Sequence, residues 1–169
     1  MSVSTQLKQT ARDLISDQDF DLVTKVVLRA NRESGMEREL AESIVDEALK
    51  FEAACAANTG EKSLSPSRLV DEGWHAIILA TRVKQRLAAK IGKFNHHVPE
   101  FPSADGGTLE RRDDAAVRSM EAIRAAGYQP NELLWTRVMD ENAAVTADCM
   151  HTECHDGGSA CSAPPSVTG

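Results

Sequence analysis

The sequence predicts an all-α fold, a compact bundle of roughly five helices followed by a flexible Cys/His-rich tail. Apolar residues recur every three or four positions in several segments, which is the spacing of one helix face. Serine, glycine and proline stand where such segments begin and end. No segment of useful length alternates apolar and polar residues as a half-exposed strand does, and no internal repeat is found.

The first clear helix is expected to begin at a cap on Asp19 and to end at Gly35, after a polar start that forms a frayed helix over residues 1–17. Its apolar stripe consists of Phe20, Val23, Val27 and Ala30. The second helix has the cleanest pattern, with Glu and Lys opposite a stripe of Leu40, Ile44, Ala48, Phe51 and Cys55. Within that stripe Cys55 is most simply a small buried hydrophobic residue.

A third helix is expected to run from Ser65-Pro66, a capping side chain with proline in the first turn, to about Ile91, where Gly92 ends it. A fourth is expected over 109–126, closed by Gly127. Pro130 then opens a short fifth helix that carries apolar residues as far as 138. Beyond about Asn142 the helical pattern fades.

Length and composition favour one folded domain, residues 1–142, with an acidic and partly disordered tail over 143–169. The net charge of −7 argues against nucleic acid or an anionic membrane as a partner. Five of the 26 acidic residues and none of the 19 basic ones lie from position 140 onward. No apolar run has the length of a membrane span and no signal-peptide core is present, so we expect a cytoplasmic protein.

The charged face of the third helix carries a candidate site. Asp71 and His75 stand four residues apart, so their side chains share one face and can meet. A carboxylate beside an imidazole fixes its tautomer and raises its basicity, as a metal ligand or a general base requires. The alternative is an ordinary solvated face with weak ion pairs. For Trp74, between them, the alternative is a core anchor.

Two adjacent histidines, His96 and His97, follow the end of this helix. Neighbouring histidines rarely face the same way, so we expect at most one of them to join His75. Asp71, His75 and one of the two would then supply three ligands with room for water, which is typical of an open metal site. The alternative is that the pair caps the helix or lies in solvent.

The tail holds a second group of candidate ligands, namely Cys149, His151, Cys154, His155 and Cys161. Thiolates and imidazoles suit zinc, copper(I) or iron centres, and the acidic residues nearby would favour a cation. The spacing is compatible with zinc without being diagnostic. It is a poor disulfide framework, and in a reducing compartment clustered cysteines indicate metal or redox chemistry first. The alternative is a disordered tail with incidental thiols.

The segments Val70-Asp-Glu-Gly-Trp-His75 and Gly92-Lys-Phe-Asn-His-His-Val-Pro99 resemble the glycine-rich domain-containing-protein-like family, closest to its short bacterial, actinobacterial members. The resemblance extends over nearly the whole chain. It implies a role for Asp71, Trp74, His75 and the His96/His97 pair. Members often carry histidine, tyrosine and cysteine at the positions occupied here by Ala80, Lys84 and Ala88, so a site that used those groups would be altered. The family brings no established reaction.

Two functions of different class follow. One is a helical metal-binding protein, with zinc as the expected cofactor and an unidentified small molecule or protein as partner, which could be a metal-dependent enzyme in which Asp71 and His75 are the catalytic candidates. The other is a non-catalytic helical protein-interaction or accessory module. The chain has no phosphate-binding glycine loop, dinucleotide fingerprint or Gly-x-Ser-x-Gly motif, so neither a nucleotide cofactor nor a serine nucleophile is expected.

Overall fold

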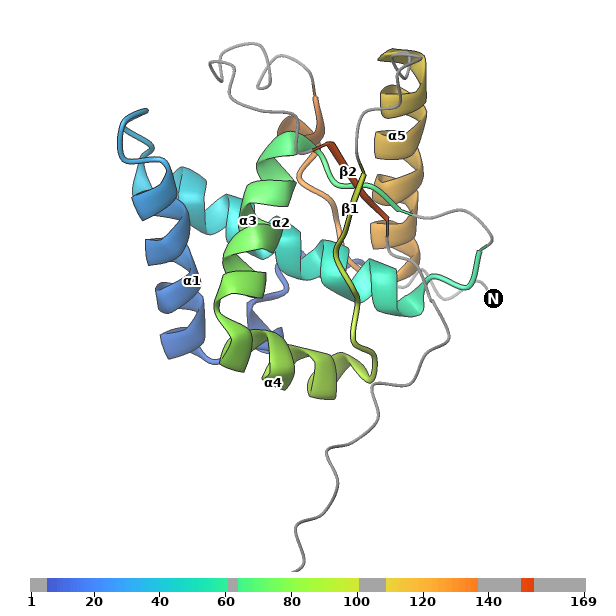
Figure 1. Cartoon of the computed structure of the whole chain (residues 1–169). Helices are drawn as coiled ribbons and strands as arrows, with labels where there is room; N and C mark the ends of the chain where they lie inside the picture. The colour runs from blue at the N-terminus through green and yellow to red at the C-terminus, as the bar shows by residue number, and fades with distance from the viewer. Residues whose placement is uncertain (1–5, 61–63, 101–108, 137–149, 154–169) are drawn as a thin grey trace, which may run out of the picture.

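A computed structural model of the chain describes residues 6–60, 64–100, 109–136 and 150–153. It confirms the all-α class (Figure 1). The elements are the 3-10 helix η1 (Arg12–Leu14), the helices α1 (Asp17–Ala30), α2 (Arg38–Ala57), α3 (Arg68–Leu79) and α4 (Thr81–Ile91), the strand β1 (Val98–Glu100), the helix α5 (Leu109–Ala125), the 3-10 helix η2 (Glu132–Trp135) and the strand β2 (Met150–Glu153). Among the described residues, no helix is long and apolar enough to cross a membrane.

Helix α2 is the centre of the fold, because α1, α3 and α5 all pack against it. Figure 1 shows it passing behind α3 on its way from α1 to α5. The Glu and Lys side chains expected opposite the apolar stripe of α2 therefore do not all face solvent. Glu47 and Glu52 are both completely buried and Lys50 is nearly so, and each is held by oppositely charged or hydrogen-bonding groups. A helix that packs against three others buries charged side chains along much of its length, while Arg38 and Glu39 in its first turn stay exposed.

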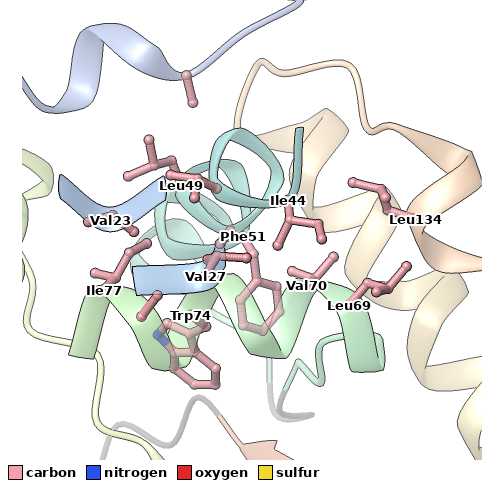
Figure 2. Packing of buried hydrophobic residues seen from close by; sticks show 14 of the residues in the cluster. Val23, Val27, Ile44, Leu49, Phe51, Leu69, Val70, Trp74, Ile77 and Leu134 are labelled. Carbon is pink, nitrogen blue, oxygen red and sulfur yellow. The ribbon is translucent and has the colours of Figure 1, made fainter. Parts of the chain in front are cut away.

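The apolar core lies between α1, α2 and α3 (Figure 2). Trp74 and Phe51 are at its centre, with their rings edge to face and 5.1 Å between centroids. The other labelled members are Val23, Val27, Ile44, Leu49, Leu69, Val70, Ile77 and Leu134. The two possible roles of Trp74, core anchor and site neighbour, are thus not exclusive: its side chain is fully buried in the core cluster.

The single third helix predicted to run to about Ile91 is wrong, because the chain turns at Ala80 (φ −82°, ψ 65°) and continues as α4. Figure 1 shows α4 leaving α3 in a new direction. The turn lets Val83 and Leu87 become fully buried, and it leaves Leu79 with 73% of its surface exposed. A single-residue break barely changes the phase of an apolar stripe, so periodicity alone does not reveal it.

Both predicted N-terminal caps are displaced. Ser16 caps α1 by accepting a hydrogen bond from the backbone N–H of Asp19 at 3.1 Å, whereas Asp19 was expected to be the cap. Ser67 caps α3 by accepting from the N–H of Val70 at 3.2 Å, and Ser65-Pro66 precedes the helix. Each true cap stands three residues before the N–H that it accepts, as capping geometry requires.

The predicted C-terminal stop at Gly92 is confirmed, since Gly92 has a left-handed φ of 79° at the end of α4. Gly35 (φ 67°) and Gly127 (φ 92°) also have left-handed backbone, in the turns that follow α1 and α5. The expected fifth helix is η2, a single 3-10 turn.

Two features near the tail were not predicted. Strand β1 pairs antiparallel with β2, so residues 150–153 lie beside the segment that directly follows His97. Cys55 is buried as expected, with 1% exposure, but it is disulfide-bonded, and its partner lies outside the described residues. The judgement that the cysteines form a poor disulfide framework is therefore wrong for Cys55.

Candidate metal centre

Asp71 and His75 meet on one face of α3, as their spacing requires. Nδ1 of His75 lies 2.9 Å from the backbone oxygen of Asp71 and 3.2 Å from its carboxylate Oδ2. A carbonyl oxygen can only accept, so Nδ1 carries the proton and donates it, which leaves the Nε2 lone pair of neutral His75 available. The hydrogen bond to Asp71 raises the pKa of His75 above its usual 6.5, against an opposing effect of burial.

His97 reaches the same place from the loop after α4. Its ring centroid lies 4.5 Å from that of His75 and 5.1 Å from that of Trp74. Its Nε2 is 3.9 Å from Oδ1 of Asp71. Burial, followed by the nearby His75, lowers the pKa of His97 below 6.5, so the neutral, metal-binding form is favoured at neutral pH.

Two polar atoms of this group stand out. Oδ1 of Asp71 and Nε2 of His97 are both buried, and neither has a hydrogen-bond partner within the described part of the chain. Their separation of 3.9 Å is too long for a direct hydrogen bond. Leaving a buried polar atom unsatisfied costs about 1–3 kcal/mol, so such atoms call for a bound species between them.

One potential ligand atom from each of Asp71, His75 and His97 lies within 4.8 Å of the other two. Ligands around a tetrahedral zinc ion stand about 3.3 Å apart, given Zn–N and Zn–O distances of about 2.0–2.2 Å. The three ligand atoms would therefore have to approach one another by up to about 1.5 Å on binding.

Of the other sequence candidates, only His96 has a described side chain, and it does not join this group. His96 is exposed, and its ring lies against that of Phe94 at 5.0 Å between centroids. For His151 only the backbone is described, in β2. Cys149, Cys154, His155 and Cys161 lie outside the described residues.

Sequence reasoning missed the buried polar groups that surround the site. Glu52 of α2 accepts hydrogen bonds from the Trp74 indole and the Asn95 side chain and forms an ion pair with Lys84. Lys84, at a position where members of the resembling family often carry tyrosine, is therefore held in a buried ion pair with Glu52 in this chain. On the other flank, Glu72 accepts a hydrogen bond from Asn31 at 2.7 Å, and burial raises its pKa. Isolated polar residues at unrelated positions give no sequence signal that they will meet.

No family model, curated protein or solved structure matches the chain. The family resemblance of the 70–75 and 92–99 segments thus stays a prediction.

Proposed function

We propose that the protein binds a divalent metal ion, zinc in the first instance, through Asp71, His75 and His97. The observation that carries the proposal is a pair of buried atoms, one carboxylate oxygen and one imidazole nitrogen, that have no hydrogen-bond partner among the described residues. Both are atoms that coordinate zinc, and the third ligand stands beside them. The resemblance to the glycine-rich domain-containing-protein-like family includes all three residues, which adds support.

The donor set favours zinc over magnesium or calcium, because two of its three groups are imidazoles rather than oxygens. The hydrogen bond from Nδ1 of His75 to the Asp71 carbonyl is the kind of outer contact that orients a metal-bound histidine. Three protein ligands leave one tetrahedral position for water or a substrate atom. A zinc ion with one carboxylate and two neutral imidazoles has net charge of about +1, which favours an anionic oxygen ligand there and lowers the pKa of a bound water.

Elemental analysis of untagged protein purified without chelators tests this proposal. We expect about one zinc per chain in the wild type and loss of the metal in His75→Ala. A third sample, truncated after Asn142, separates the helical residues from the tail. Metal kept after truncation places the site on the helices, whereas metal lost only on truncation means that the tail cysteines and histidines hold it. Folded wild-type protein that takes up no metal contradicts the proposal.

A further inference from the structure

Two glutamates of α2 are completely buried, and each is the centre of a similar polar cluster. Glu47 accepts from the Trp135 indole at 2.8 Å, the backbone N–H of Asn131 at 3.0 Å and the Lys50 ammonium at 3.2 Å. That cluster attaches η2 to α2, away from Asp71, His75 and His97.

The Glu52 cluster has the same chemistry, but it adjoins the candidate metal centre. Its carboxylate accepts from the Trp74 indole at 2.7 Å and from the Asn95 amide at 2.6 Å, and it pairs with Lys84. The Asn95 amide also donates to the backbone oxygen of Glu52 at 2.9 Å. The buried Asn95 is thus fixed to α2 twice, which anchors the loop after α4.

These bonds connect Glu52 to both sides of the centre. Trp74 directly precedes His75 on α3, and its ring lies 5.1 Å from that of His97. Asn95 stands two residues before His97, a separation of at most about 7 Å along the chain. One carboxylate therefore holds the helix that carries Asp71 and the loop that carries the third ligand.

We propose that Glu52 is the positioning residue of this metal centre, which rests on the function proposed above. Glu52 does not touch the metal. It keeps the 94–97 loop against α3, so that the imidazole of His97, and not that of the exposed His96, faces Asp71. The affinity of a metal site depends on such outer contacts, because protein side chains that are not already held in place must lose conformational freedom when the metal binds.

The substitution Glu52→Gln keeps the shape of the side chain and removes the charge. A glutamine amide presents donors where the carboxylate presented acceptors, so either Asn95 or Trp74 loses its partner and Lys84 loses its counter-charge. Glu47→Gln makes the same change in the same helix, to a carboxylate that is bonded by the same types of donor. It is therefore the matched control for any general loss of stability.

The test is a zinc titration in competition with a chromophoric chelator at neutral pH, with urea unfolding of each variant to set conditions in which all are folded. We expect Glu52→Gln to bind zinc about 10- to 100-fold more weakly than the wild type, and Glu47→Gln to bind it normally. Asn95→Ala should weaken zinc binding as well, while the Glu52–Lys84 pair stays intact, and it covers the case in which Glu52→Gln does not fold.

The outcomes are distinguishable. Wild-type protein that takes up no zinc overturns the proposed function. Zinc binding that Glu52→Gln and Asn95→Ala leave unchanged, or that Glu47→Gln weakens equally, overturns the positioning role and leaves the metal site standing.

Discussion

The contact between α2 and α3 gives the sharpest test of the packing, through the substitution Gly73→Ala. Gly73 is buried in α3, where an added Cβ would lie 2.8 Å from the backbone oxygen of Ile44, 3.0 Å from its Cγ2 and 2.9 Å from the Cβ of Ala48. Real Cβ atoms do not approach this closely. Relief requires α3 to move away from α2, since a helical carbonyl cannot rotate aside.

Two effects of opposite sign act on this substitution. Alanine is better than glycine inside a helix by about 1 kcal/mol. Overpacking a dense core costs about 1–3 kcal/mol, and a contact with main chain belongs at the upper end. We therefore expect Gly73→Ala to lower the free energy of unfolding by about 2 kcal/mol.

Urea unfolding followed by tryptophan fluorescence measures this change, because both tryptophans are buried and become exposed on unfolding. The measurement is made with chelator present, so that metal does not contribute. Ala89→Gly, at an exposed position of α4, calibrates helix propensity alone and should cost about 1 kcal/mol. If Gly73→Ala is instead more stable than the wild type, the gain in helix propensity outweighs the cost of overpacking. That result would contradict the close contact between α2 and α3 at Gly73.

Three further predictions concern the side chains of Lys84, Ser67 and His97. Lys84→Met leaves Glu52 buried without its counter-charge and should lower the free energy of unfolding in urea by about 3–5 kcal/mol. The control Lys25→Met, at an exposed ion pair, should lower it by less than about 1 kcal/mol. Equal losses of stability in the two variants would contradict the buried ion pair. Ser67→Ala removes the cap of α3 and also the hydrogen bond that the Ser67 hydroxyl donates to the backbone oxygen of Leu134 at 2.6 Å, so it should lower the free energy of unfolding by about 1–2 kcal/mol in thermal unfolding. An unchanged melting temperature would contradict both contacts. In metal-free protein, the neutral form of His97 stabilises the fold above its ordinary pKa of 6.5, and this contribution is lost as pH falls through its lowered folded-state pKa. His97→Ala should therefore lose less stability than the wild type on acidification below pH 6.5, and parallel curves of unfolding free energy against pH would refute this assignment.

The sequence predicts those parts of the fold that depend on local pattern. The stripes of α1 and α2 and the stop at Gly92 are visible because each is set within a few residues. The burial of Glu47 is not visible, because its indole partner stands 88 positions away. The turn at Ala80 is missed for the same reason, since it is favoured by where Val83 and Leu87 can be buried.

The candidate site divides in the same way. The Asp71–His75 pair follows from helical spacing and needs no tertiary information. The choice between His96 and His97 cannot be made from sequence, because it is decided by the two hydrogen bonds that fix Asn95, in the same loop, to Glu52 of α2.

The adjacent histidines provide the most direct test of the metal centre. Zinc titrations of His97→Ala and His96→Ala compare two identical substitutions one residue apart, one at a partly buried potential ligand and one at an exposed side chain. We expect His97→Ala to lose zinc binding and His96→Ala to bind about one zinc per chain with wild-type affinity. Equal zinc binding by the two variants would contradict the assignment of His97 to the metal centre.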